Sequence, residues 1–151
     1  TDGSYGVWYG SLELTTTIYE TCYHIFKAIA SIEDHPNIVK QERAVYTVHC
    51  EGILIDLSSK TDVHPDLVSN DYALCHLIGK KLQKEGHPGI LYASARTEGL
   101  NLAVFNPHIL SNPQDNCFLT YIISTRDKII RIEREVTKEL LTIDAGKAFG
   151  L

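Results

Sequence analysis

Segments with the composition of β-strands outnumber segments with the periodicity of helices, and the two kinds do not alternate regularly. From residue 43 to residue 57 the chain is rich in β-branched and aromatic residues, and Glu51-Gly52 indicates either two strands or one bent strand. Because a parallel α/β sheet requires regular alternation, this order favours an α+β fold with mixed or antiparallel sheets and flanking helices. The other expected strands cover residues 7–9, 89–93, 100–105, 118–124 and 129–135.

Two helices are expected from apolar residues that recur three or four positions apart. The first covers about residues 16–30, and Thr17 with Glu20 has the spacing of a capping box at its start. The second begins near Asn70 or Asp71 and ends before Gly86. The tail, residues 144–151, is expected to be mobile or to dock onto a partner. The expected buried stripe of the second helix consists of Ala73, Leu74, Leu77, Ile78 and Leu82.

The length of 151 residues is usual for one domain, so we expect residues 1–151 to form a single domain. The chain starts at Thr1 and contains no methionine, which indicates that a few N-terminal residues are missing. Its net charge of -5 disfavours a general nucleic-acid binder, since affinity for phosphate backbones comes mainly from Lys and Arg. The four cysteines lack C-x-x-C spacing and lie beside apolar residues, which favours reduced core thiols in a cytoplasmic protein.

A few polar positions are candidates for chemistry. Glu20 lies early in the first helix, where capping is the role that its spacing alone favours. Ser94 and Arg96 follow an expected strand, where a serine is more often a turn residue and an arginine can pair with Glu98 at the surface. The next strand would bring Asn101 close to Ser94. These patterns alone indicate an α+β domain and leave its function open.

Two ordered sequence blocks are more specific. The first is GVWYG at residues 6–10 with TIYETCYH at residues 17–24. The second is GILYASAR at residues 89–96, extended by NLAVFNP at residues 101–107. Over about residues 1–110 the chain resembles the RES-domain family, in which an aromatic strand leads into a helix that carries a glutamate.

The RES family is named after an arginine, a glutamate and a serine in that order. By resemblance, Glu20 and Ser94 fall on the second and third of these residues. The family's arginine lies shortly before the aromatic strand, but no Arg or Lys occurs between Thr1 and Trp8. That arginine therefore lies upstream of Thr1, or this copy has lost it. Arg96 loosely matches a second arginine of the family.

The resemblance also implies an activity and a partner. RES proteins are toxins of bacterial toxin–antitoxin pairs, with a core similar to that of ADP-ribosyltransferases. They consume NAD, which is their substrate, by hydrolysis, phosphorolysis or transfer of ADP-ribose. Their partner is an antitoxin with a helix-turn-helix DNA-binding domain, so the toxin itself need not bind DNA, and a homodimer is compatible with this pattern. A mono-ADP-ribosyltransferase and a non-catalytic binding module are the alternatives.

Each expected site residue suits one part of NAD cleavage. Breaking the nicotinamide–ribose bond develops positive charge on the sugar, which the carboxylate of Glu20 would stabilise. Ser94 would bond the nicotinamide amide or a ribose hydroxyl, and Arg96 suits the pyrophosphate. Tyr9 can stack on the flat nicotinamide cation or pack in the core. The seven histidines are scattered along the sequence and predict no metal site. The expected NAD-binding residues are Tyr9, Arg96, Tyr5 and Asn101.

Overall fold

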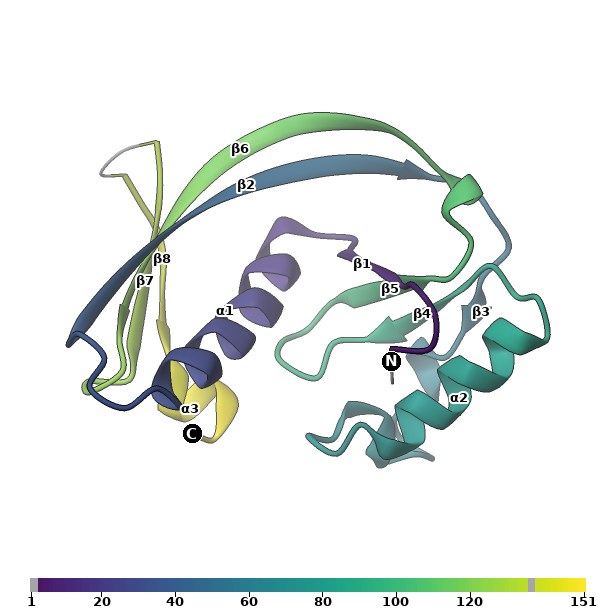
Figure 1. Ribbon diagram of the computed structural model, residues 1–151, viewed down its shortest axis with the longest axis horizontal. Coiled ribbons are helices and arrows are strands. Elements are labelled where there is room, and N and C mark those ends of the chain that lie inside the picture. Colours follow the sequence, from purple (N-terminus) through teal and green to yellow (C-terminus); the bar gives the residue numbers. More distant parts are fainter. Residues whose placement is uncertain (1–2, 136–137) are drawn as a thin grey trace. The chain divides into compact units, whose positions relative to one another are not determined.

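The computed structural model describes residues 3–135 and 138–151, which fall into two compact units (Figure 1). Unit 1 contains the residues up to Tyr19 and the segment Cys50–Ser111. Unit 2 contains Glu20–His49 and Asn112–Leu151. Each unit has one four-stranded sheet with helical segments beside it, so the predicted α+β class with mixed and antiparallel sheets is confirmed.

The sheet of unit 1 joins strands that lie far apart in the sequence. Its order is β1-β5-β4-β3, in which β5 is antiparallel to β1 and β4, and β3 is parallel to β4. Ile90, Leu102 and Val104 are buried in it. The strands are β1 (Trp8–Ser11), β3 (Ile55–Asp56), β4 (Gly89–Ala93) and β5 (Leu100–Val104), and the short 3-10 helices are η1 (Ser58–Lys60), η2 (Pro65–Val68) and η3 (Pro107–Ile109).

Helix α2 (Ala73–Lys84) packs against β4 in unit 1. Asp71 Oδ1 accepts the backbone N–H of Ala73 at 3.0 Å, and the helix begins slightly later than the sequence predicts. The predicted stripe is partly wrong, because Ala73 is exposed and Leu77 is 68% exposed. The helix turns Gly79 toward the interior of the unit, and this rotates Leu77 into solvent.

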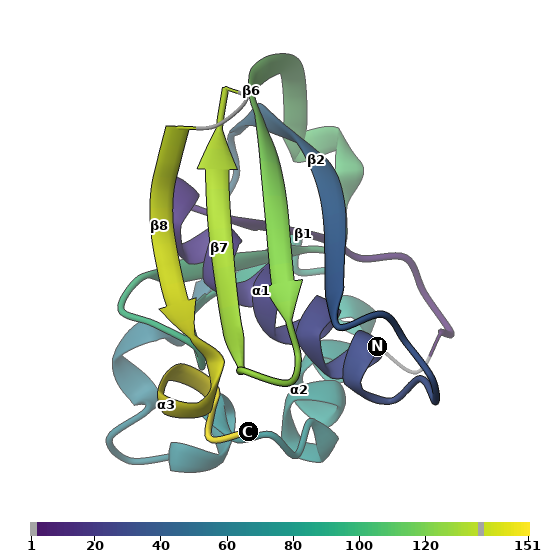
Figure 2. The ribbon, with the colours of Figure 1, turned by 90° about the vertical axis from the view of Figure 1, so that its left-hand side faces the viewer.

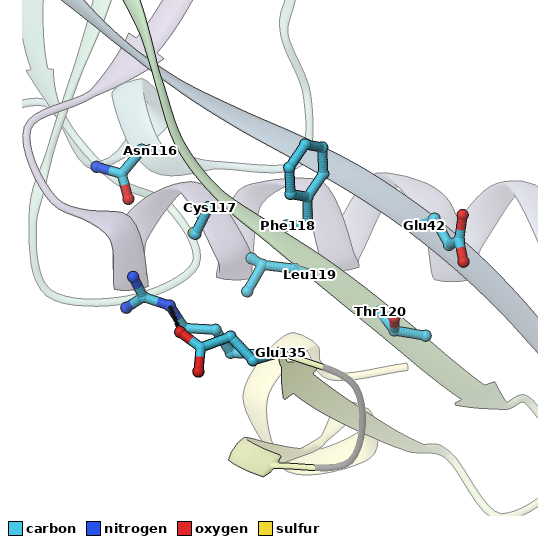
Figure 3. Close-up of a pocket in the computed structure, with 8 residues that line it drawn as sticks. Glu42, Asn116, Cys117, Phe118, Leu119, Thr120 and Glu135 are labelled. Carbon is cyan, nitrogen blue, oxygen red and sulfur yellow. Dashed lines mark ion pairs between the residues drawn. The ribbon is translucent and has the colours of Figure 1, made fainter.

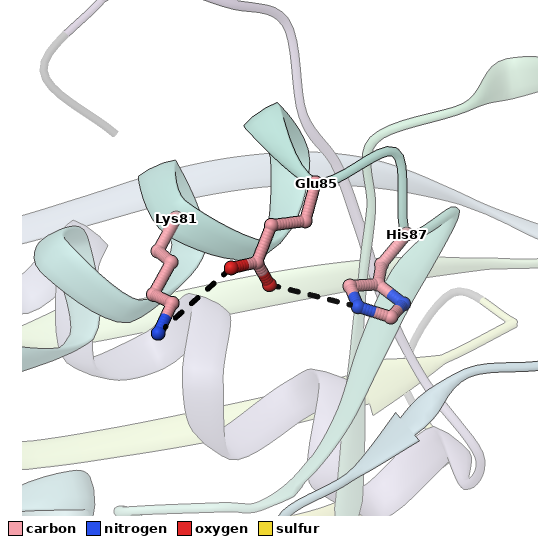
Figure 4. Close-up of polar contacts among 3 residues, drawn as sticks. All are labelled: Lys81, Glu85 and His87. Carbon is pink, nitrogen blue, oxygen red and sulfur yellow. Dashed lines mark ion pairs between the residues drawn. The ribbon is translucent and has the colours of Figure 1, made fainter.

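At the C-terminal end of α2, Glu85 lies between Lys81 and His87 on the surface (Figure 4). Glu85 Oε1 lies 3.8 Å from Lys81 Nζ, and Glu85 Oε2 lies 3.8 Å from His87 Nε2. Pairs as exposed as these stabilise a fold by about 1 kcal/mol at most. The turn between Glu85 and His87 requires glycine at residue 86, because the φ of Gly86, +83°, lies in the left-handed region that favours glycine.

The sheet of unit 2 has the order β2-β6-β7-β8 (Figure 2). Alternate residues of β6 and β7 point into the core, where Ile123, Ile130 and Ile132 are fully buried. Residues 20–30 of α1 cover one face of this sheet, and Thr21 Oγ1 lies 2.9 Å from Tyr121 Oη. The elements are α1 (Leu14–Ala30), which begins in unit 1, β2 (Ile38–Cys50), β6 (Leu110–Ser124), β7 (Ile129–Arg134), β8 (Lys138–Asp144) and α3 (Ala145–Phe149).

Strand pairing extends further than the sequence pattern predicts. Residues 43–57 form two strands, because β2 ends at Cys50 and β3 begins at Ile55. β6 begins at Leu110 and not near residue 118, since its polar first half belongs to the sheet through its backbone. β8 is missing from the prediction because its exposed first residues show no alternation of apolar and polar types.

The C-terminal residues form part of unit 2, so the expectation of a mobile tail is wrong. Asp144 Oδ1 accepts the N–H of Lys147 at 3.0 Å and caps α3. Phe149 is buried, and its ring lies 5.6 Å from that of Tyr23 in an edge-to-face arrangement. Burial of one aromatic side chain fixes this short helix, since five residues of helix would not be stable alone.

All four cysteines are free, as predicted, but only Cys22 is a core thiol, buried beside Tyr121 in unit 2; Cys50, Cys75 and Cys117 are partly exposed. Burial raises the pKa of Cys22 from 9.0 to about 12 and that of Tyr121 from 10.0 to about 12. The unfolded chain would release both protons at lower pH than the folded chain. The folded state therefore binds more protons between about pH 9 and pH 12, and its stability falls as the pH rises through that window.

We expect the free energy of unfolding to be nearly level up to about pH 9 and to fall steeply above it. Tyr121→Phe removes one of the two groups and should make the fall shallower. Tyr46→Phe is the matched control, because Tyr46 is 60% exposed in β2. Urea denaturation at several pH values measures the slope. An equal slope in Tyr121→Phe and in the wild type would contradict the assignment.

Candidate functional site

The two sequence blocks meet in the sheet of unit 1. β1 of the first block pairs with β5 of the second, with Tyr9 opposite Ala103 and Ser11 opposite Asn101. Ser11 Oγ donates a hydrogen bond to Asn101 Oδ1 at 2.6 Å, and Asn101 is buried. Since side chains alternate between faces, Tyr9, Ser11 and Asn101 lie on the same face of the sheet.

Ser94 lies where β4 ends in a tight loop back to β5. Its N–H donates to the carbonyl of Gly99 at 2.9 Å, which extends the ladder by one pair. Its Oγ accepts the N–H of Arg96 at 3.0 Å and that of Thr97 at 3.3 Å. The register thus brings Ser94 near Asn101, because Tyr92, two residues before Ser94, lies opposite Asn101. We call residues 94–99 the Ser94 loop.

Arg96 is buried, with 8% of its surface exposed, so a solvent-exposed pair with Glu98 is not its role. Its Nη1 donates to Asn70 Oδ1 at 2.6 Å and its Nη2 donates to Tyr72 Oη at 2.9 Å. The sequence pattern gives no functional role to Asn70 or Tyr72, because it places them at the start of an expected helix and outside both sequence blocks. Their only signal is the polar composition of the segment before α2.

The first turn of α1 reaches the other end of the Ser94 loop. Thr16 is fully buried, and its Oγ1 has no hydrogen-bond partner among the described residues. A Cβ atom added to Gly99 would collide with Thr16 Oγ1, and Gly99 has a φ of +138°. This position therefore requires glycine both for its backbone and for its contact with α1.

Glu20 is half-buried in the second turn of α1 and belongs to unit 2, whereas the other predicted site residues belong to unit 1. The helix begins at Leu14, so the capping interpretation of Thr17 and Glu20 is wrong. The N–H of Thr17 already donates to the carbonyl of Glu13 at 3.1 Å. A capping side chain acts at the helix end, where N–H groups lack an intrahelical partner. Thr17 and Glu20 lie beyond that end.

The two predicted tyrosines differ in their surroundings. Tyr9 is 57% exposed, so packing in the core does not explain it. The pKa of Tyr9 is raised above 10.0, mainly by its partial burial and to a smaller extent by the neighbouring Tyr5 and Cys75. Tyr9 therefore stays a neutral phenol at physiological pH. Tyr5 packs edge-on against Phe105 at 5.8 Å, and its Oη lies 2.9 Å from the position of a Cβ on Gly79.

Unit 2 contains a separate pocket of about 520 Å³ (Figure 3). It is lined by residues of β2, β6 and β7 with Glu135, and none of the predicted site residues contributes to it. Among residues 3–135 and 138–151, no three His, Cys, Asp or Glu side chains gather as a metal site would require. No helix in the described part of the chain is long and apolar enough to cross a membrane.

Comparison with known proteins gives one clear result. The family model described as RES domain matches residues 1–124, which include both sequence blocks. A search of curated proteins found no match. The match extends the region of resemblance beyond β5 and into β6.

Proposed function

Because this chain belongs to the RES-domain family, we propose that it is an NAD-consuming toxin that cleaves the bond between nicotinamide and ribose. The reaction is hydrolysis or phosphorolysis, in which water or phosphate takes the place of nicotinamide on the ribose. A cognate antitoxin with a helix-turn-helix domain neutralises it. Membership of the family agrees in general with the use of NAD by an enzyme.

The pairing of the two family blocks in one sheet carries this proposal. A nucleotide site needs polar groups from several segments at one place. The register of β1, β5 and β4 supports such a site, because it brings together strands that carry or adjoin Tyr9, Asn101 and Ser94, from two blocks about 80 residues apart in sequence.

Glu20 is the proposed catalytic carboxylate. Loss of nicotinamide makes the ribose cationic, and a fixed negative charge nearby lowers the energy of that transition state. The start of α1 at Leu14 removes the capping role, which was the main alternative for Glu20. Nicotinamide leaves as a neutral base, so the reaction needs no general acid.

The remaining roles follow from side-chain chemistry. Ser94 bonds the nicotinamide amide or a ribose hydroxyl and holds the leaving group in one orientation. Arg96 contributes positive charge near the pyrophosphate while its guanidinium stays bonded to Asn70 and Tyr72. Tyr9 offers an exposed aromatic face for the nicotinamide cation, with Tyr5 as the second candidate and Asn101 as a further polar contact.

The direct test is release of nicotinamide from NAD by the protein, with and without phosphate. Release in both buffers supports a glycohydrolase, and a requirement for phosphate supports a phosphorylase. Labelled NAD added to a cell lysate would mark a discrete protein if the reaction transfers ADP-ribose instead. Binding of NAD without release would assign the chain to a non-catalytic module and overturn the proposal.

A further inference from the structure

We infer that Asn70 and Tyr72 are positioning residues that fix Ser94 through Arg96. The three residues Asn70, Tyr72 and Arg96 form what we call the Arg96 clamp. The segment before α2 thereby becomes part of the catalytic apparatus, although it lies outside both sequence blocks. The inference rests on the proposed role of Ser94 in NAD cleavage.

The clamp begins at a segment that is itself held in place. Ser69 Oγ donates to the carbonyl of Asp71 at 2.9 Å and accepts its N–H at 3.1 Å. Asp71 Oδ1 in turn accepts the N–H of Ala73, the first residue of α2. The ring of Tyr72 stacks on His76 in the first turns of α2, with 6.1 Å between centroids and 20° between planes. Asn70 and Tyr72 therefore present their oxygens from a fixed platform.

These oxygens bind the two ends of one guanidinium group. The bonds to Asn70 Oδ1 (2.6 Å) and Tyr72 Oη (2.9 Å) come from different nitrogens, so they set both the position and the plane of the group. Hydrogen bonds from a charged donor are stronger than those between neutral groups. Arg96 itself is buried, whereas Asn70 and Tyr72 are exposed, so the two bonds are partly shielded from water. The side chain of Arg96 thus ties its own backbone to the platform.

The backbone of Arg96 acts directly on Ser94. Its N–H donates to Ser94 Oγ at 3.0 Å, and the next N–H, that of Thr97, donates to the same oxygen at 3.3 Å. Two donors on one oxygen restrict the rotation of the hydroxyl and direct its proton away from the loop backbone. A displaced Arg96 would release this restriction.

Tyr72→Phe tests the clamp at one atom, because it removes the phenol oxygen and keeps the ring on His76. Tyr46→Phe, on the exposed face of β2, is the matched control. We expect the amide protons of Arg96 and Thr97 to exchange at least about tenfold faster in Tyr72→Phe, measured residue by residue by NMR. Unchanged exchange at both amides would overturn the inference, whatever the activity of the protein.

Kinetic measurements test whether the Arg96 clamp acts through Ser94. We expect Tyr72→Phe to lower kcat/KM for nicotinamide release by about tenfold, with melting temperature nearly unchanged. In a double-mutant cycle, adding Tyr72→Phe to Ser94→Ala should cause no further loss of kcat/KM. An equal loss in both backgrounds would indicate a merely structural role and contradict the inference. Asn70→Asp keeps the acceptor and should retain more activity than Asn70→Ala.

The two readouts separate this inference from the proposed function. A wild-type protein that leaves NAD intact, with faster exchange in Tyr72→Phe, would defeat the NAD proposal and the inferred role in catalysis but keep the clamp's contact with Ser94. An active wild type whose Arg96 and Thr97 amides do not respond to Tyr72→Phe would defeat the clamp and keep the enzyme.

Discussion

Glu20→Gln should lower the rate of nicotinamide release by about 100-fold to 1,000-fold. The substitution keeps the size and hydrogen-bonding ability of the side chain and removes its charge. Fixed electrostatic groups of this kind typically contribute about 3–4 kcal/mol to transition-state stabilisation. The loss should appear in kcat more than in KM, since the ribose becomes cationic only as the bond breaks. Steady-state rates with NAD as substrate measure it.

Glu13→Gln is the matched control for Glu20. Glu13 is exposed and immediately precedes α1, so its loss changes the net charge by the same amount without touching the proposed site. We expect wild-type rates for this variant. Equal rates in Glu20→Gln and the wild type would remove Glu20 from the mechanism, even if NAD is still consumed.

Gly99→Ala should lower the free energy of unfolding by about 3–4 kcal/mol. The methyl group would collide with the buried Thr16, and overpacking of this kind costs about 1–3 kcal/mol. The φ of +138° adds backbone strain of about 1–3 kcal/mol for a residue with a side chain. Urea denaturation followed by circular dichroism measures the change.

Two further variants separate the collision from the strain. Gly86 has a φ of +83° with no atom within 4 Å of an added Cβ, so Gly86→Ala should cost only about 1–2 kcal/mol. Thr16→Ala, added to Gly99→Ala, removes the colliding Oγ1 and should restore part of the stability. If Gly99→Ala and Gly86→Ala cost the same, the close approach of α1 to the Ser94 loop contributes nothing.

Periodicity predicted those elements whose side chains alternate clearly or follow a helical repeat. β4 and most of α1 have the predicted bounds because their apolar residues are buried on one side. β8 and the first half of β6 were missed because exposed polar residues occupy strands that backbone pairing holds. Leu77 was misplaced because Gly79, which gives no apolar signal, faces the interior.

For the candidate site, the sequence could predict residues that lie next to each other in a motif. Ser94, Arg96 and Asn101 follow from the second block, and their proximity follows from an antiparallel pair of strands. Asn70 and Tyr72 could not be predicted, since their role depends on tertiary contacts with Arg96, which lies 26 and 24 residues away in sequence, respectively. Thr16 belongs to a threonine-rich run, but its contact with Gly99 is equally a product of tertiary packing.

The most direct measurement of the central claim is the appearance of free nicotinamide when the purified protein is mixed with NAD. The account predicts that one nicotinamide appears for each NAD lost, over many turnovers per protein molecule, in buffer with phosphate, in buffer without it, or in both. Proton NMR measures both species. NAD that remains intact in both buffers, with a folded protein, would contradict it.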